Sequence, residues 1–106
     1  MKRFGQIIKV KKEKLFEYKQ LHAAPWQEVL DLIKASNIQN YSIFVYNEDL
    51  LFAYFEYVGI NIENDFEKLS SHPTILQWWQ HTNPCQESLS STGKGWLDLE
   101  QVFLLE

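Results

Sequence analysis

A tyrosine and a histidine lie four residues apart in the stretch 16–28, just before a proline. Residues i and i+4 of a helix emerge one turn apart on one face, so Tyr18 and His22 are expected side by side. Histidine can both give and take a proton near neutrality, because its unperturbed pKa is ~6.5. Pro25 should end the helix beside His22, where a pocket can form. The pair indicates acid–base chemistry on a small molecule, although a histidine that only packs would give the same pattern.

Other patterns that carry chemistry are absent. The chain has only four glycines, and they form neither a phosphate-binding loop nor a dinucleotide-binding motif. No Gly-x-Ser-x-Gly motif is present, and Cys85 has no activating neighbours in the sequence. His72, His81 and Cys85 raise the possibility of a metal site, but their spacing matches no common zinc pattern and Pro84 lies between the last two. We therefore expect no metal.

Composition limits the class of protein. The 106 residues are 45% hydrophobic, which indicates one globular domain over residues 1–106. A net charge of −4, without a large basic patch, argues against nucleic acid as a partner. The sequence has no apolar run near 18 residues and no signal peptide, so we expect no membrane association. A single cysteine fits a reducing compartment, and a cytoplasmic location is expected.

The elements that would position these residues follow from periodicity and turn signals. Strands are expected over residues 4–10, 40–46, 50–58 and 97–105. Helices are expected over residues 12–23 and 25–36, over a short segment carrying Phe66 and Leu69, and over residues 74–81 after Pro73. Residues 82–95 read as a long loop, which is typical of a lid or a partner contact.

The order of these elements predicts an α+β fold, the ferredoxin-like split β-α-β arrangement with a four-stranded antiparallel sheet. The strands over 40–46 and 50–58 are apolar on both faces. Helices can cover only one face, so we expect a homodimer that forms through the other. Trp78 and Trp79 point about 100° apart on a helix, so one can pack while the other lines a cavity.

Several separate motifs resemble the L-rhamnose mutarotase family. They are the spacing Tyr18-x-x-x-His22-x-x-x-Trp26-x-Glu28, the segments Asn40–Phe44 and Leu51–Ala53, the pair Trp78-Trp79, and the closing segment Leu99–Leu104. The similarity covers nearly the whole chain. It implies a homodimer of ferredoxin-like subunits that interconverts the α and β anomers of L-rhamnose, or of a related 6-deoxy sugar, without a cofactor. It also implies that His22 is the proton donor and that Tyr18, Tyr41, Trp78 and Trp79 contact the sugar.

The residues suit this reaction, an aldose 1-epimerase reaction in which the C1–O5 bond opens and closes again on the other face. Opening requires an acid at O5 and a base at the anomeric hydroxyl, and closure reverses the two roles. Two other functions remain open. A cofactor-free monooxygenase would use the same dimeric fold and an aromatic pocket, and a non-catalytic sugar-binding module would keep the aromatic residues without needing His22.

Overall fold

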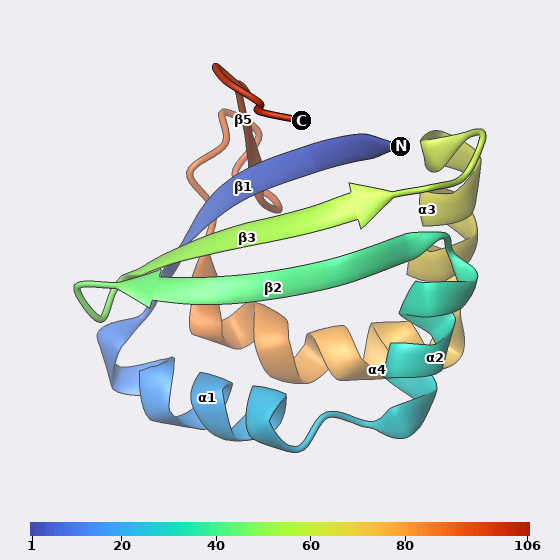
Figure 1. The fold of residues 1–106 in the computed structure, drawn as a ribbon. Coiled ribbons are helices and arrows are strands. Elements are labelled where there is room, and N and C mark those ends of the chain that lie inside the picture. Colours follow the sequence, from blue (N-terminus) through green and yellow to red (C-terminus); the bar gives the residue numbers. More distant parts are fainter.

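The computed structural model describes residues 1–106 and confirms the predicted α+β, ferredoxin-like order of elements. The strands are β1 (Lys2–Val10), β2 (Ile38–Tyr46), β3 (Leu50–Tyr57), β4 (Gln86–Glu87) and β5 (Leu97–Leu99). The helices are α1 (Leu15–Ala23), α2 (Gln27–Ala35), α3 (Ile62–Ser71) and α4 (Pro73–Thr82), with 3-10 turns at Lys12–Lys14 and Asn83–Cys85. All four helices lie on one side of the sheet (Figure 1). None of the helices is long and apolar enough to cross a membrane.

The antiparallel sheet has the order β2-β3-β1, and β4 and β5 share the remaining edge of β1. Strand β4 pairs with Lys9 and Val10, whereas β5 pairs with Gly5–Ile7. The fourth strand of the fold is therefore divided into two short pieces, with residues 88–96 between them. The prediction of a strand over residues 97–105 is wrong beyond Leu99, because the residues that follow pair with no strand of this chain. This C-terminal segment lies beyond β1, on the opposite side of the sheet from β2 (Figure 1).

The helix ends follow local chemistry with one exception. The first helix ends at Ala23, as Pro25 predicts, but the second begins at Gln27 rather than at Pro25. Trp26 is extended (φ −69°, ψ 131°) and precedes the first turn of α2 as its N-cap. Pro73 does occupy the first position of α4, and the side chain of His72 caps this helix by accepting a hydrogen bond from the Thr74 amide at 3.1 Å.

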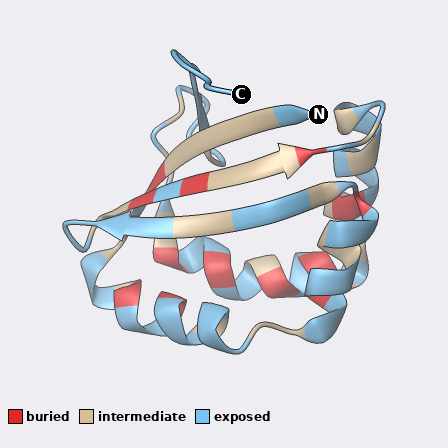
Figure 2. Ribbon diagram, viewed as in Figure 1, coloured by how far each residue is buried: buried red, intermediate tan, exposed pale blue.

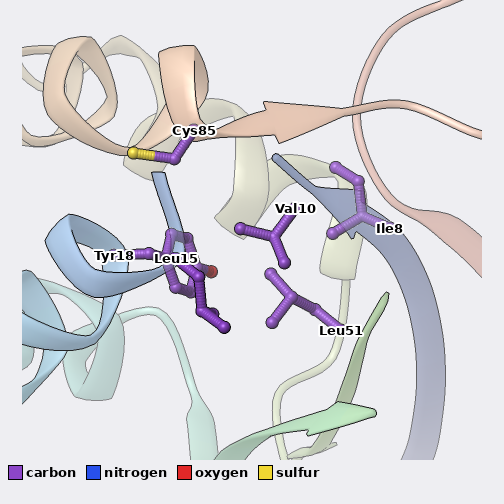
Figure 3. Close-up of a cluster of buried hydrophobic side chains, with 6 residues drawn as sticks. All are labelled: Ile8, Val10, Leu15, Tyr18, Leu51 and Cys85. Carbon is purple, nitrogen blue, oxygen red and sulfur yellow. The ribbon is translucent and has the colours of Figure 1, made fainter. Parts of the chain in front are cut away.

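Two clusters of buried side chains join the helices to the sheet. One cluster contains Ile8, Val10, Leu15, Tyr18, Leu51 and Cys85, and it packs α1 and the Asn83–Cys85 turn against β1 and β3 (Figure 3). The other cluster contains Val29, Leu69, Ile75 and Trp78, and it joins α2, α3 and α4. Full burial of such side chains is worth about 1.5–3 kcal/mol each. As a result α1 and α4, which carry four of the five predicted site residues, are packed firmly against the sheet.

The sheet face that points away from the helices is also apolar. Leu51 of β3 is buried against the helices, so its neighbour Phe52 points outward. Leu97, Ile7, Phe52 and Phe44 lie in register across β5, β1, β3 and β2. Phe44 is 63% exposed and Phe52 is 36% exposed, and Figure 2 shows exposed and half-buried stretches along these strands. The predicted apolar character of both faces is confirmed.

Candidate active site

His22 lies in the last turn of α1, and its Nδ1 atom is 2.8 Å from the carbonyl oxygen of Tyr18. A carbonyl oxygen can only accept a hydrogen bond, so Nδ1 must carry the proton. The other ring nitrogen, Nε2, makes no hydrogen bond to the protein, and the residue is exposed. In the neutral ring Nε2 is therefore a proton acceptor, and in the imidazolium it is a proton donor. A backbone atom thus determines which nitrogen of His22 can exchange a proton with a ligand.

Two aromatic rings flank the imidazole. The ring of Tyr18 lies 4.3 Å from that of His22 at an interplanar angle of 31°, which confirms the expected pair one helical turn apart. Trp78 of α4 meets the imidazole edge-on, at 5.6 Å and 71°. Tyr18 and Trp78 are both buried, at 4% and 7% exposure. The histidine ring is therefore held between two side chains that are themselves fixed in the core.

A hollow of about 350 Å³ opens between α1 and β2, next to this ring. Its volume lies within the usual range of small-molecule sites, roughly 300–1,000 Å³. The residues around it are mostly apolar, with few polar groups, as in most such sites. They are Leu15, Tyr18, Lys19, His22, Ala23, Ile43, Phe44, Val45 and Leu51.

Tyr41 does not line this hollow, but an irregularity in β2 places it near Tyr18, whose pKa it helps to raise. Strand pairing shifts between Gln39 and Ser42, so that two residues of β2 face Phe55 of β3. Asn40 has a left-handed backbone there (φ 54°), and its amide donates a 2.8 Å hydrogen bond to the carboxylate of Glu56. This bulge turns the ring of Tyr41 toward the helices, where it lies 5.7 Å from that of Phe55.

The two tyrosine hydroxyls are neutral donors. Burial raises the pKa of Tyr41 to about 12, although the residue as a whole is 41% exposed. Burial also raises the pKa of Tyr18 well above its usual range, and the neighbouring Tyr41 hydroxyl and Cys85 thiol add to that rise. Both phenols therefore stay protonated at neutral pH and are suited to donating hydrogen bonds rather than to taking protons.

Trp79 lies apart from these residues. Its ring packs 6.3 Å from Phe66 of α3 and lines a separate, open hollow with Leu76, Gln80, Asn83 and Pro84. Of the two adjacent tryptophans, only Trp78 contacts His22. A contact between Trp79 and a sugar stays a prediction.

The residues once considered for a metal are engaged separately. His72 caps α4, and His81 meets Trp26 edge-on at 5.5 Å. The buried Cys85 thiol donates a hydrogen bond to the Glu17 carboxylate at 3.1 Å. Burial is the main cause that raises the pKa of this thiol to about 11, and the carboxylate is the second. No three His, Cys, Asp or Glu side chains gather as metal ligands do.

Two residues at the site were not predicted. Lys19 lines the pocket and could have been found from its place three residues before His22, one turn away on the same helix. The helix predicted over residues 25–36 includes Trp26, but this residue precedes α2 as its N-cap, and its ring lies against α4, 5.3 Å from that of Trp78. Together the residues offer one imidazole of fixed tautomer, two neutral phenols and an aromatic wall, a set that can bind a polyol ring and move its hydroxyl protons.

Comparison with known proteins agrees with this set of groups. A family model described as L-rhamnose mutarotase matches residues 3–105. The chain is 35% identical to an L-rhamnose mutarotase from Bacillus subtilis over all of both chains, and 32% identical to one from Shouchella clausii over 99% of both. The crystal structure of an L-rhamnose mutarotase from Formosa agariphila superposes with a TM-score of 0.81 at 25% identity, covering all of both chains.

A second solved structure shares only the fold. Tetracenomycin F2 cyclase from Streptomyces glaucescens has a TM-score of 0.73 at 12% identity, and the match covers 100% of this chain and 98% of the cyclase. The same backbone arrangement therefore supports different chemistry, so the site must be interpreted from its own side chains.

Proposed function

The chain belongs to the L-rhamnose mutarotase family, whose members interconvert the α and β anomers of this sugar, and we propose that His22 carries the proton transfer at the anomeric centre. The observation that supports this role is the hydrogen bond from His22 Nδ1 to the Tyr18 carbonyl oxygen. It leaves Nε2 as the one ring atom able to exchange a proton with a sugar. The enzyme is thus an isomerase, and a positioned acid–base group of this kind is worth roughly 10²–10⁴-fold in rate.

In the proposed mechanism, ring opening breaks the C1–O5 bond. The bonding electrons pass to O5, which takes a proton from Nε2 of the His22 imidazolium, while the anomeric hydroxyl loses its proton to water and becomes the aldehyde oxygen. Rotation about C1–C2 then presents the other face of the aldehyde. Closure runs in reverse, as O5 attacks C1, the aldehyde oxygen takes a proton and Nε2 takes one back from O5. The histidine ends in its starting state.

The tyrosines and one tryptophan bind the sugar in this proposal. Tyr18 and Tyr41 donate hydrogen bonds from neutral hydroxyls, because their raised pKa values make them poor bases at neutral pH. Trp78 lies against His22, but it is 7% exposed and does not line the hollow, so its contact with the C–H groups of the sugar is proposed by resemblance. Trp79 is a substrate contact only by resemblance, since its ring faces the separate hollow.

Magnetisation-transfer NMR on the anomeric protons tests the function directly. With L-rhamnose we expect the protein to speed α–β exchange far beyond the spontaneous rate, and a parallel titration should change tryptophan fluorescence. L-fucose and other deoxy sugars, run under the same conditions, define the preference. Binding of L-rhamnose without faster exchange would contradict the function and favour a sugar-binding module.

The homodimer is also part of this proposal. Phe44 and Phe52 are exposed on the outer sheet face, and a second copy of the same face is the partner that would cover them. The C-terminal segment supports the same assembly, because Val102, Phe103 and Leu105 are 88%, 76% and 81% exposed. Apolar side chains on a short terminal segment are stabilised only when another surface buries them.

A cytoplasmic location is proposed as well. The chain's one cysteine, Cys85, is a buried free thiol rather than part of a disulfide. Free thiols and an absence of disulfides fit a reducing compartment. Cell fractionation with an antibody to the protein would test the location.

A further inference from the structure

Trp26 occupies an unusual place between two helices. It follows Pro25 in the break between α1 and α2, and its backbone is extended. Its carbonyl oxygen accepts hydrogen bonds from the amides of Val29 at 3.0 Å and Leu30 at 3.3 Å, which fixes the residue at the start of α2. These hydrogen bonds fix the backbone of Trp26 to the first turn of α2, whereas its ring packs against another helix.

The ring of Trp26 is held against α4 at two points. It meets Trp78 edge-on at 5.3 Å and 70°, and it meets His81 at 5.5 Å and 80°. Trp78 and His81 are three residues apart, so they lie next to each other on one face of the helix. The indole thus packs against neighbouring side chains of α4 and joins the start of α2 to that helix.

These contacts continue to the imidazole. In order, Trp26 touches Trp78, Trp78 touches His22, and His22 lies against Tyr18. Neither Trp26 nor Trp78 lines the hollow beside His22, but the ring of Trp78 meets the imidazole, whereas the ring of Trp26 meets only those of Trp78 and His81. Besides Tyr18, Trp78 is the aromatic ring in contact with the imidazole, and Trp26 is the ring that packs against Trp78.

We infer that Trp26 is a positioning residue for His22, acting through Trp78 to hold the imidazole in the orientation that keeps Nδ1 on the Tyr18 carbonyl and Nε2 toward the sugar. This inference rests on the proposed role of His22. Without the indole, Trp78 can move away and the imidazole can turn. A displacement of about 1 Å at a reacting group can reduce a rate by up to ~10²-fold.

The first experiment measures anomer exchange for Trp26→Leu, which keeps an apolar side chain but removes the aromatic edge. We expect kcat to fall about tenfold with KM within about twofold, because Trp26 orients a catalytic group without touching the sugar. Trp26→Phe should restore most of kcat. The matched control is Phe16→Leu, a 73% exposed aromatic on α1, which should leave kcat unchanged.

A double variant tests whether the effect passes through Trp78. In a Trp78→Phe background, the further change Trp26→Leu should lower kcat by less than about twofold, since residues that act through one contact are not additive. An undiminished tenfold loss in that background would overturn the inference, as would an unchanged kcat in Trp26→Leu alone.

The tautomer of His22 gives a readout that does not depend on activity. Long-range ¹H–¹⁵N spectra should show His22 with its proton on Nδ1 in the wild-type protein and a mixture of tautomers in Trp26→Leu. His22→Ala assigns the signal among the three histidines. An unchanged single tautomer in a folded Trp26→Leu protein would contradict the inference. If the wild-type protein failed to exchange anomers, the proposed function would fail, while this spectrum would still decide the role of Trp26.

Discussion

The chemistry of the site depends on how each side chain is fixed. The backbone carbonyl of Tyr18 sets the tautomer of His22, whereas burial sets the protonation of the phenols of Tyr18 and Tyr41. These are independent physical controls, and together they assign different tasks to chemically similar groups. The imidazole exchanges protons, and the phenols donate hydrogen bonds.

Tyr18→Phe separates these tasks. The variant loses a neutral hydroxyl, but it keeps the ring that packs against His22 at 4.3 Å and the backbone carbonyl that orients it. We therefore expect KM for L-rhamnose to rise several-fold, because the loss of one hydrogen bond to the sugar costs about 1 kcal/mol of binding free energy. The change in kcat should be smaller. Anomer-exchange kinetics over a range of sugar concentrations measures both constants. A kcat as low as that of a histidine variant would instead make Tyr18 the acid–base group.

The raised pKa of Tyr41 predicts an alkaline effect on stability. A folded pKa of about 12, above the usual value of 10.0, means that the folded state holds this proton more tightly than the unfolded chain does. The protonated phenol's contribution to the free energy of unfolding is complete below pH 10 and is lost as pH rises toward 12. Urea unfolding across this pH range should show that the free energy of unfolding falls less with rising pH in Tyr41→Phe than in the wild type. Parallel losses in the two proteins would show that this phenol does not titrate as described.

Two irregular segments place the site, and they differ in how far the sequence predicts them. Pro25 predicts the break after α1, because a proline cannot donate the hydrogen bond that would continue the helix and disfavours helical geometry at the preceding residue. The bulge in β2 is not predictable in this way, since the left-handed backbone of Asn40 is supported by Glu56, a residue on another strand. Local rules therefore located His22 and Tyr18, while the route by which Tyr41 reaches them needed the sheet register.

Asn40→Val tests the bulge. A β-branched residue at φ 54° is strained, and the hydrogen bond to Glu56 is lost, so we expect a loss of about 2 kcal/mol in stability by urea unfolding. Sugar affinity should weaken as well, because Tyr41 would lose its placement. Asn40→Gly, which tolerates the backbone angle, is the matched control and should lose less stability. Equal stability of the valine and glycine variants would mean that the left-handed backbone carries no strain.

The limits of prediction from sequence are clearest at Trp79 and at the C-terminal end. Helical spacing predicted that Trp78 and Trp79 diverge, yet only the packing of α3 shows that Trp79 meets Phe66. Apolar residues after Leu99 have the composition of a strand. They pair with no strand, although the edge of β1 over residues 2–4 is free, so strand-like composition does not by itself decide pairing.

At the scale of the whole molecule, the helices cover one face of the sheet and leave the other apolar (Figure 2). A second copy of the chain would bury that face and leave α1, with His22, on the far side of the sheet. The two sites of such a dimer would lie apart, each within its own subunit. Assembly would then support the fold of the site rather than take part in the reaction.

Phe52→Lys tests this assembly. Phe52 lies in the middle of the outer face, so a buried lysine there should convert the protein to a monomer. Light scattering should give twice the 12.6 kDa of one chain for the wild type and the mass of one chain for the variant. Phe16→Lys, on the helical side, is the matched control and should remain dimeric. A monomeric wild type at micromolar concentration would contradict the proposed dimer.

The central claim is that His22 moves the proton that opens the sugar ring, and anomer exchange in His22→Ala tests it most directly. Magnetisation transfer between the α and β anomeric protons of L-rhamnose should show rapid exchange with the wild-type protein. With the variant we expect a loss of roughly 10²-fold or more, with sugar affinity by tryptophan fluorescence largely retained, because Tyr18, Tyr41 and Trp78 remain. Exchange at the wild-type rate in a folded His22→Ala protein would contradict the mechanism.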